Sequence, residues 1–478
     1  MKTEPVDILE LLKHNTPSSC WIVLHSHVYD VTDFIHEHPG GADLILRHAG
    51  GDATEDYEQY HAPELVDQIL PVTACLGRVD PAKIPKQKPQ LDQGTDGTNR
   101  KEGSQVPPLN SLINLDDFEQ VAEKNLPVNA WAYYSSAAED EITKDENRHV
   151  FRKVYLRPRI LRDVGDIDTS TSILGYRCSL PVFVCPAAMA KLAHPDGECA
   201  IAAAAGHEGL IQVVSTSSSM PIHSVMKARI REDQPVFFQL YVLKNLERTK
   251  AMIRLAEEAG MKALWVTVDS PVIGKRERDE RVKAAIQITD QAGSVRKGQE
   301  VQGIARTMSS VITPRLSWDD LKWIREMTSL PLVIKGIQTV EDAILAYQHG
   351  VTGIVLSNHG GRSQDTTQPP LLTLLEIRKH APFLIGGKME IYLDGGIRRG
   401  RDVIKALALG ATAVGLGRPF LYSLCGYGEL GVRRMVSILR DEVVTNMALA
   451  GVRQIQEITP DLVNASKLQR DLLSGARL

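Results

Sequence analysis

Residues 390–420 read EIYLDGGIRRGRDVIKALALGATAVGLGRPF and set the expected architecture of the chain. An apolar run ends in Asp-Gly-Gly, a stretch of helical character follows, and a second apolar run ends in Gly-Arg-Pro. Apolar runs without alternation are typical of parallel strands that are buried on both faces. The stretch therefore predicts a strand–helix–strand unit with a glycine-rich turn after each strand.

The same unit recurs along the 478-residue chain. Short β-branched runs alternate with stretches rich in Ala, Leu, Glu and Lys, and the runs lie at 181–188, 211–217, 236–242, 263–270, 331–337, 353–361, 390–397 and 413–420. These eight units predict an α/β fold whose parallel strands close into a (β/α)8 TIM barrel. A doubly wound open sheet is the alternative.

A segment of different composition, residues 81–108, precedes the barrel. It has no aromatic and few aliphatic residues and is rich in Pro, Gly, Gln and Lys, so we expect a linker. This linker separates a small head, residues 1–80, from a barrel domain over residues 109–478. A unit as small as the head often needs a cofactor or metal for stability.

The net charge of -4 conceals an asymmetry between the two parts. The head holds 4 Lys/Arg and 14 Asp/Glu, a balance of -10, whereas the remaining residues carry +6. Seven of the 14 histidines also lie in the head. An acidic, His-rich head argues against nucleic acid as a partner and favours a basic protein.

Composition and the chain ends bound the class of protein and its location. With 43% hydrophobic and 24% charged residues, the chain is not wholly disordered, and no apolar run approaches the ~18 residues of a membrane helix. The six cysteines form no CxxC pair, which disfavours a disulfide scaffold or zinc site and fits a reducing compartment. The start MKTEPVDILE shows no secretory or mitochondrial presequence. The end Ala476-Arg477-Leu478 is either a frayed tail or a variant peroxisomal address, so we expect a cytoplasmic or peroxisomal protein.

Polar residues gather at the carboxyl ends of the predicted strands, where TIM barrels carry their active sites. They are Gln239, Tyr241, Thr267, Asp269, Lys335, Ser357, His359 and Asp394. The glycine-rich turns at 394–400 and 415–419, with Arg398 and Arg418 beside them, predict a phosphate site. The connection 271–316 is long enough to be a lid, an interface or a disordered segment.

The motif SNHGGR at 357–362 is the most specific of these features. His359 is a candidate general base, and Asp269 could orient its imidazolium. Arg362 can bind a carboxylate through two parallel hydrogen bonds, and Lys335 can stabilise an electron-rich ring as it becomes anionic. For each residue taken singly, a structural ion pair is the alternative.

In the head, HPGG at 38–41 and YHAP at 60–63 each contain a histidine, His38 and His61. Two imidazoles on facing helices can hold an iron from both sides, whereas the alternative is a turn with an exposed histidine. The head resembles a cytochrome b5-type haem domain of the α+β class, and the resemblance implies that His38 and His61 are the axial ligands of haem b. Two protein ligands leave no open position on the iron, which favours electron transfer.

The body resembles the FMN-dependent α-hydroxy acid dehydrogenase/oxidase family over residues 109–460. The matching motifs are AYYSSAAEDE (132–141), PAAMAKLAHPDGE (186–198), FQLY (238–241), TVDSP (267–271), SNHGGR, LDGGIRRGRDV and GRP. The resemblance implies that His359 removes a substrate proton with Asp269 behind it. It implies that Tyr133 and Arg362 bind the substrate carboxylate and Tyr241 the hydroxyl, with Arg276 assisting.

The resemblance also implies a cofactor site. It places FMN against Pro186, Ala187, Ala188, Ser215, Gln239, Thr267, Lys335 and Ser357, and the FMN phosphate against Asp394, Gly395, Gly396, Arg398, Gly417 and Arg418. Lys283 corresponds to a position that reaches the haem propionates. The sequence departs from the family's pattern at Ala187, where many members have Thr, and at Ser217, where others have Leu or Trp. Because Ser217 and Ala188 are both small and would line the pocket for the substrate side chain, we expect this pocket to be roomier.

A haem head on such a body resembles the cytochrome-linked members of the family. They imply oxidation of an L-2-hydroxy acid, L-lactate to pyruvate first, with single electrons passing through haem to a basic cytochrome c-like acceptor. They also imply a homotetramer, and the mitochondrial intermembrane space as an alternative location. One rival is an oxidase of glycolate, mandelate or a longer 2-hydroxy acid that reduces O2. The other is a non-catalytic electron carrier on an inert barrel.

Overall fold

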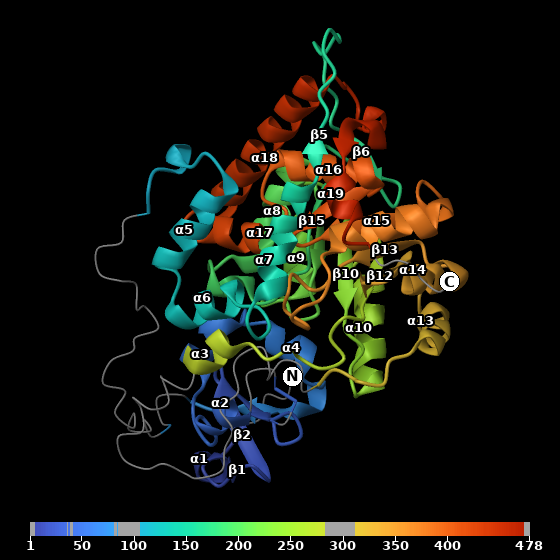
Figure 1. The fold of residues 1–478 in the computed structure, drawn as a ribbon. Helices are drawn as coiled ribbons and strands as arrows, with labels where there is room; N and C mark the ends of the chain where they lie inside the picture. Colours follow the sequence, from blue (N-terminus) through green and yellow to red (C-terminus); the bar gives the residue numbers. More distant parts are fainter. Residues whose placement is uncertain are drawn as a thin grey trace.

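A computed structural model of the chain describes residues 5–35, 37–38, 42–80, 84, 106–282 and 311–472. Figure 1 shows a small unit formed by the first part of the chain, in blue, against one end of a larger barrel. Several predictions concern residues outside the described ranges: Lys283, the tripeptide Ala476–Leu478, the glycines of the HPGG motif and most of the linker. The boundaries at 80/81 and 108/109 stay predictions.

Eight parallel strands form a closed barrel in the order β10-β11-β12-β13-β14-β15-β8-β9. They are β8 (Val182–Val184), β9 (Ile211–Val214), β10 (Val236–Leu240), β11 (Leu264–Thr267), β12 (Leu332–Ile337), β13 (Gly353–Leu356), β14 (Glu390–Asp394) and β15 (Ala413–Leu416). Each strand lies within one of the eight predicted runs, and closure rules out the open sheet. The (β/α)8 prediction is confirmed.

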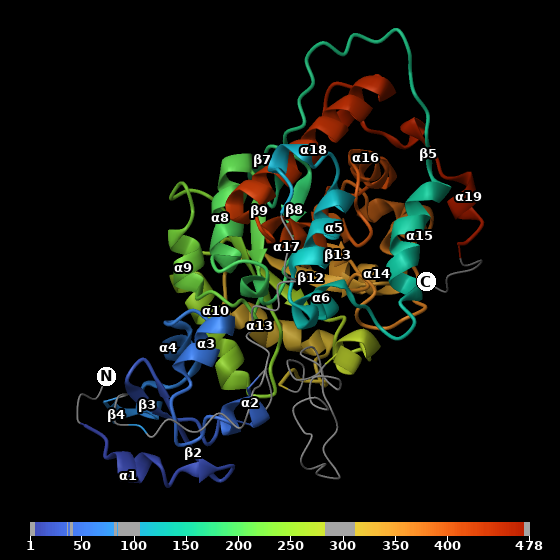
Figure 2. The ribbon, with the colours of Figure 1, turned by 90° about the vertical axis from the view of Figure 1, so that its left-hand side faces the viewer.

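Helices surround the barrel, as Figures 1 and 2 show from two sides. They are α8 (Gly197–Glu208), α9 (Ile222–Lys227), α10 (Leu246–Glu258), α13 (Leu321–Met327), α14 (Val340–Gln348), α15 (Pro370–His380), α16 (Gly400–Leu409), α17 (Arg418–Leu424) and α18 (Gly428–Ala450). Helices α5 (Leu115–Asn125), α6 (Val128–Ser135) and α7 (Ile142–His149) precede the first barrel strand, and α19 (Ser466–Gln469) follows the barrel. The strands are largely apolar, in keeping with outer faces that are covered by these helices and inner faces that pack on one another.

Short elements complete this domain. The 3-10 helices are η3 (Leu109–Ser111), η4 (Val150–Lys153), η5 (Ala190–Leu192), η6 (Trp318–Asp320), η7 (Pro382–Leu384), η8 (Ile455–Glu457) and η9 (Pro460–Leu462). Strands β5 (Tyr155–Leu156) and β16 (Val463–Asn464) pair with each other, and β6 (Thr171–Ile173) pairs with β7 (Tyr176–Cys178).

Aromatic side chains fill one part of the barrel interior. Trp265 stacks on Tyr392 at 5.4 Å between ring centroids and meets Phe183 edge-on at 5.0 Å. The hairpin β6–β7 packs on this layer, where Tyr176 contacts Phe237 at 5.9 Å. Because large buried rings leave no room for a ligand in this layer, the chemistry is confined to the loops at the carboxyl ends of the strands.

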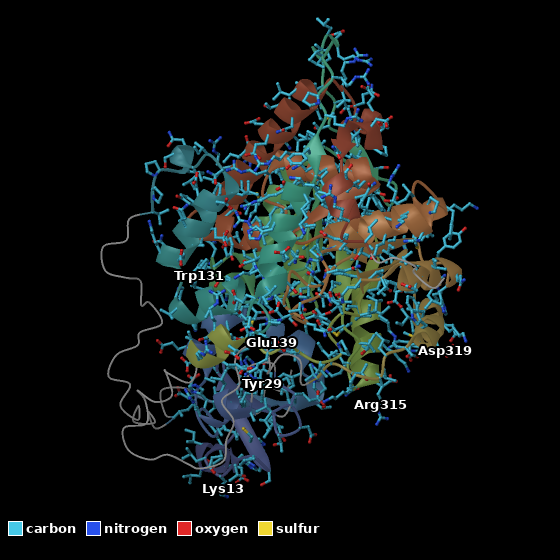
Figure 3. The ribbon with its side chains drawn as sticks, in the orientation of Figure 1. Lys13, Tyr29, Trp131, Glu139, Arg315 and Asp319 are labelled. Carbon is cyan, nitrogen blue, oxygen red and sulfur yellow. The ribbon has the colours of Figure 1, made fainter. Side chains whose placement is uncertain are left out.

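The head is a separate α+β unit. Its antiparallel sheet comprises β1 (Asn15–Thr16), β2 (Ser19–Leu24), β3 (His27–Asp30) and β4 (Cys75–Arg78) in sequence order, with helices α1 (Ile8–Leu11), α2 (Ala42–Leu46), α3 (Thr54–Tyr60) and α4 (Leu65–Ile69) and the 3-10 helix η1 (Val72–Ala74). A small core of Cys20, Ile22, Tyr29, Ile35, Ile45 and Val66 supports it. In Figure 3, Lys13 and Tyr29 lie in this head and Trp131 lies on the larger domain. Within the described ranges, no helix has both the length and the apolar character needed to cross a bilayer.

Candidate active site

The most specific sequence motif forms a hydrogen-bonded pair at the mouth of the barrel. His359 lies in the loop after β13, and its Nδ1 is 2.7 Å from Oδ1 of Asp269 in the loop after β11. On the other side of the ring, Nε2 lies 3.5 Å from the Tyr241 hydroxyl. The backbone of His359 is left-handed, with φ of 58°, a costly conformation that is typical of functional sites. Two residues after His359, a Cβ on Gly361 would lie 2.6 Å from the backbone nitrogen of Lys144, so only glycine fits there.

A buried cation stands beside this pair. The Lys335 ammonium lies 3.5 Å from Oδ2 of Asp269 and 3.5 Å from Oδ2 of Asp394, and it donates to the Ser357 hydroxyl at 3.0 Å. Burial alone would lower the pKa of Lys335, but the two carboxylates outweigh it and hold that pKa above its usual value. Lys335 is therefore a permanent positive charge at neutral pH.

The charges around His359 keep it ready to accept a proton. Burial would raise the pKa of Asp269, but His359 and Lys335 outweigh burial and hold that pKa below its usual range. Burial lowers the pKa of the His359 imidazole, with the Lys335 charge acting in the same direction and Asp269 opposing it. At neutral pH the pair is accordingly a carboxylate beside a neutral imidazole, which is the state that a general base requires.

Three arginines gather near this pair. Burial, followed by the charge of Arg362, lowers the pKa of Arg276 to about 9, and burial lowers that of Arg418 to about 10. Arg362 donates through Nη1 to the carbonyls of Tyr133 at 2.8 Å and Ser136 at 2.9 Å, and its guanidinium lies 5.1 Å from the centre of the Tyr133 ring. A buried Arg276 beside the partly buried Arg362 and Arg418 forms a site that an anion would stabilise.

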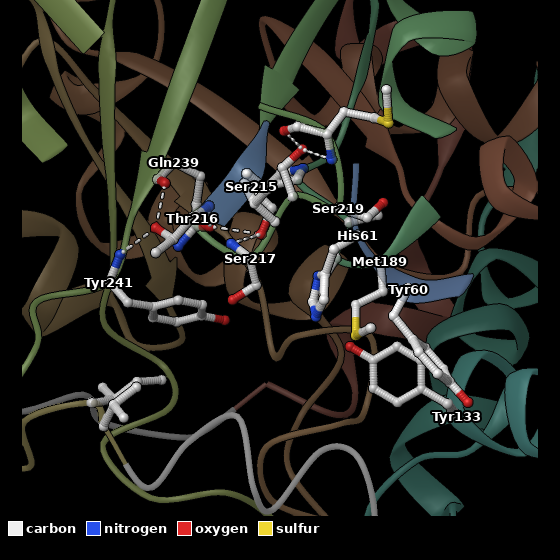
Figure 4. Close-up of a pocket in the computed structure, with 18 of the residues that line it drawn as sticks. Tyr60, His61, Tyr133, Met189, Ser215, Thr216, Ser217, Ser219, Gln239 and Tyr241 are labelled. Atoms are coloured by element: carbon white, nitrogen blue, oxygen red, sulfur yellow. Dashed lines mark hydrogen bonds between the residues drawn. The ribbon is translucent and has the colours of Figure 1, made fainter. Parts of the chain in front are cut away.

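Most predicted site residues line one cavity of about 670 Å³. These are Tyr133, Pro186, Ala187, Ala188, Ser215, Gln239, Thr267, Tyr241, Arg276, Lys335, His359, Arg362, Asp394, Gly395, Gly396, Arg398, Gly417 and Arg418. Figure 4 shows Ser215, Gln239 and Tyr241 on its wall. Asp269 and Ser357 lie behind this wall, where Ser357 accepts hydrogen bonds from Lys335 and from the His359 backbone. Ser357 thus supports Lys335 and His359, and its contact with FMN stays a prediction.

The cavity wall fits a flavin nucleotide. Gln239 Oε1 accepts hydrogen bonds from the Ser215 hydroxyl at 3.2 Å and from the Thr216 backbone at 3.1 Å. These bonds fix the orientation of the side-chain amide and leave its Nε2 group available to donate to a ligand. Among the residues that the structure describes, several buried atoms of the wall have no hydrogen-bond partner, including Gln239 Nε2, Thr267 Oγ1, Asp394 Oδ1 and Arg398 Nε. Such atoms are rare in folded proteins, so a group of them on one cavity indicates the atoms that would contact a polar ring and a phosphate.

The glycines at 395 and 396 serve packing as well as access. Both have positive φ, 92° and 83°. A Cβ on Gly396 would fall 1.8 Å from the Asn147 carbonyl, so the loop after β14 lies directly against α7. This close approach keeps Arg398 within the cavity wall, with its Nε 3.8 Å from Asp116 and 3.7 Å from Glu119.

The two histidines of the head face each other. The ring centroids of His38 and His61 are 6.1 Å apart, with 74° between the ring planes. An imidazole nitrogen lies roughly 2 Å from a bound metal, so this separation leaves room for one metal atom between the rings. Within the described part of the chain, the buried His61 Nδ1 has no hydrogen-bond partner, and burial, then His38 and Lys191, lower the pKa of His61 to about 3. The residues fit a haem iron that is held from both sides.

The space between His38 and His61 opens onto the barrel cavity. His38 and His61 line the same continuous cavity as Gln239 and His359. Figure 4 shows His61 pointing into it beside Met189, Ser217 and Tyr133. The structure thus brings together the two sites that the sequence predicted separately.

Sequence reasoning missed Glu198, which is buried in the first turn of α8. Its carboxylate accepts hydrogen bonds from the backbone of Ala190 at 3.1 Å and of Ser219 at 2.9 Å, and from the Ser219 hydroxyl at 2.8 Å. It thereby ties the loops after β8 and β9 together. The only sequence signal was its place at the end of the motif PAAMAKLAHPDGE.

Residues 122–465, more than half of the chain, match the FMN-dependent dehydrogenase family. The chain belongs to this family. Residues 8–80 match the cytochrome b5-like heme/steroid binding domain. The unit carrying His38 and His61 is therefore a haem-binding domain, and the barrel of this FMN-dependent dehydrogenase is its flavin domain.

Relatives with both domains match almost the whole chain. L-lactate dehydrogenase (cytochrome) of Wickerhamomyces anomalus is 43% identical over 97% of this chain and 81% of its own length. Glycolate oxidase 3 of Arabidopsis thaliana is 41% identical but covers 73% of this chain. Among solved structures, a mutant flavocytochrome b2 with benzoylformate superposes with a TM-score of 0.71 at 40% identity, over 80% of this chain and 94% of that one.

Proposed function

We propose that this FMN-dependent dehydrogenase oxidises an L-2-hydroxy acid to the 2-oxo acid, with L-lactate as the leading candidate substrate. It then passes the electrons one at a time through haem b to a cytochrome c-like acceptor. The observation that carries the proposal is the single cavity lined by His359, with Asp269 hydrogen-bonded behind it, and by both haem-ligand histidines. Relatives named L-lactate dehydrogenase (cytochrome) span both domains, which supports the proposal over an oxidase.

Residues around the cavity divide the work of substrate oxidation. Arg362 and Arg276, with Tyr133, would bind the carboxylate, because buried guanidiniums gain most from an anion at this position. The neutral His359 would accept a proton from the substrate, and Asp269 would stabilise the imidazolium that results. The Tyr241 hydroxyl, 3.5 Å from His359 Nε2, would hold the substrate hydroxyl beside the base.

Lys335 supplies the electrostatic part of the reaction. Two carboxylates and Ser357 already hold the Lys335 ammonium in place. The ammonium therefore does not have to move when negative charge develops beside it during the reaction. When bound, FMN takes up the two electrons of the substrate and haem carries them away one at a time. The balanced reaction yields a 2-oxo acid, two protons and two electrons per hydroxy acid.

The head favours a basic redox partner. Its balance of -10 over residues 1–80 would steer a positively charged cytochrome toward it. We also propose a homotetramer and a cytoplasmic or peroxisomal location, with the mitochondrial intermembrane space as the alternative. These last proposals rest on the sequence and its family resemblance alone.

An anaerobic visible spectrum before and after addition of L-lactate tests the proposed function. We expect the flavin band to bleach and the bands of reduced haem to appear. Bleaching without haem reduction would support an oxidase in place of the electron-transfer enzyme. Absence of any change with L-lactate, glycolate and mandelate in a sample that holds both cofactors would contradict the proposal.

A further inference from the structure

Two cations of the barrel domain reach the head beside its two haem-ligand histidines. Arg248, in the first turn of α10, forms an ion pair with Glu37, the residue before His38. Lys191, in η5, donates from Nζ to the backbone carbonyl of His61 at 2.7 Å. One barrel cation is thus attached to each side of the iron site.

Arg248 makes a double contact with the segment that carries His38. Its guanidinium pairs with the Glu37 carboxylate and also lies 5.5 Å from the centre of the Phe34 ring. The Phe34 ring in turn meets the His38 ring edge-on at 5.8 Å. Arg248 is 30% exposed and Glu37 39%, so this pair is only partly screened by water. The contact therefore constrains the ring of the ligand as well as its backbone.

Lys191 holds the segment that carries His61. Besides the His61 carbonyl, the Lys191 ammonium donates a hydrogen bond to the Glu58 carbonyl at 2.9 Å. These carbonyls lie at the end of α3, where a helix leaves acceptors unsatisfied and a cation is favourable. The Ala62 backbone also donates to the Ser219 carbonyl at 3.2 Å.

The barrel side of this second contact is rigidly supported. The Lys191 backbone donates to the Ser219 hydroxyl at 3.0 Å, and Glu198 holds Ser219 from behind at 2.8 Å. Glu198 is 2% exposed. A buried carboxylate that accepts several hydrogen bonds has little freedom to move. The Glu198 carboxylate therefore holds the loop that bears Lys191, and the Lys191 ammonium is kept at a defined position.

We propose that Lys191 and Arg248 are positioning residues that hold the haem domain in its electron-transfer orientation, with the iron site open to the flavin cavity. This inference rests on the proposed function. Electron transfer between two groups slows steeply as their separation grows, so a change in the seating of the head would slow haem reduction without altering substrate oxidation. The charges agree with this role, because an acidic head is held by cations of a basic body.

A charge-reversal cycle tests the Arg248 contact. In stopped-flow measurements with L-lactate, Arg248→Glu and Glu37→Arg should each slow haem reduction by about tenfold or more, the factor equal to ~1.4 kcal/mol. The rate of flavin bleaching should stay at the wild-type value. The double variant should recover haem reduction to within about threefold of wild type, because it restores an ion pair of opposite polarity.

Hydrogen–deuterium exchange of the cofactor-loaded protein without substrate gives a readout that is independent of turnover. In Arg248→Glu we expect faster exchange of the peptide containing residues 31–38, and in Lys191→Met of the peptide containing residues 54–62. Lys250→Ala is the matched control, since this neighbouring cation of α10 pairs with Glu247 of its own helix at 2.7 Å. It should change neither exchange nor haem reduction.

The outcomes separate this inference from the proposed function. Wild-type haem-reduction rates and wild-type exchange in both Arg248→Glu and Lys191→Met would overturn the positioning role. Slow haem reduction in Arg248→Glu that the double variant does not restore would overturn the specific pairing with Glu37. If L-lactate leaves the wild-type flavin oxidised, the proposed function fails, while the exchange experiment still decides whether the two cations hold the head.

Discussion

His359 and Asp269 are 90 residues apart in the chain, yet their Nδ1 and Oδ1 atoms lie 2.7 Å apart. The hydrogen bond fixes which nitrogen of the ring faces Asp269 and leaves Nε2 toward Tyr241, 3.5 Å away. In this arrangement the imidazole can take a proton on its cavity side. The buried carboxylate on its other side then stabilises the positive charge of the imidazolium.

Replacement of the base, His359→Gln, should slow flavin bleaching by L-lactate by about 10²- to 10⁴-fold, the usual contribution of a general base. The side chain of Gln cannot accept the proton at neutral pH. The absorbance of bound haem should remain at the wild-type level, which controls for folding. A rate within a few-fold of wild type would contradict the role of His359.

The pH dependence of flavin bleaching should show an acid limb with a midpoint below ~6.5, the ordinary value for histidine. Burial and Lys335 lower the pKa of His359 against the opposing effect of Asp269, so the imidazole stays neutral, and active, in mildly acidic solution. The rate should fall only when the pH drops through this lowered pKa and the base becomes protonated. In Asp269→Asn the limb should move to still lower pH and the maximal rate should fall. A limb above pH 7 in the wild type would show that another group controls the reaction.

Removal of one iron ligand, His61→Ala, should abolish cytochrome c reduction and the haem spectrum of a six-coordinate iron. Flavin bleaching by L-lactate should persist, since His61 belongs to the head and the proton-accepting pair to the barrel. Spectra of the purified variant and its bleaching rate provide the test. An unchanged haem spectrum would contradict ligation by His61.

The rate of cytochrome c reduction should fall steeply as salt rises from ~20 to ~200 mM, because the Debye length shortens from roughly 20 Å to below 10 Å. The head has a balance of -10, so encounter with a basic acceptor depends on long-range attraction. Reduction of ferricyanide, a small anion, by the same preparation provides the comparison. A salt-independent rate with cytochrome c would count against docking on the head.

The size of the substrate pocket can be tested at Ser217, which lies on the cavity wall and is labelled in Figure 4. Ser217→Leu should lower kcat/KM for mandelate relative to L-lactate by about 10- to 200-fold, the range for added bulk in an apolar pocket. An unchanged ratio would place the substrate side chain elsewhere.

Local patterns in the sequence were sufficient for the barrel. All eight strands of the barrel lie within the predicted runs, because a strand buried on both faces is largely apolar, and a few consecutive residues are enough to show that pattern. The polar residues at the ends of these runs were predicted to lie together, because the carboxyl ends of parallel barrel strands meet at one face of the barrel. Motifs of the head and body also pointed to haem and FMN, which the matching families confirm.

Other features exist only in the folded molecule. Ser357 accepts hydrogen bonds from Lys335 and from the His359 backbone, and Glu198 joins two loops that no periodicity connects. The contacts of Arg248 with Glu37 and of Lys191 with His61 join residues of different domains. Strand and helix patterns arise from the environment of neighbouring residues, and a sequence carries them locally. Pairing between two surfaces depends on how complete domains pack, so only the tertiary structure could reveal that His38, His61 and His359 line one cavity.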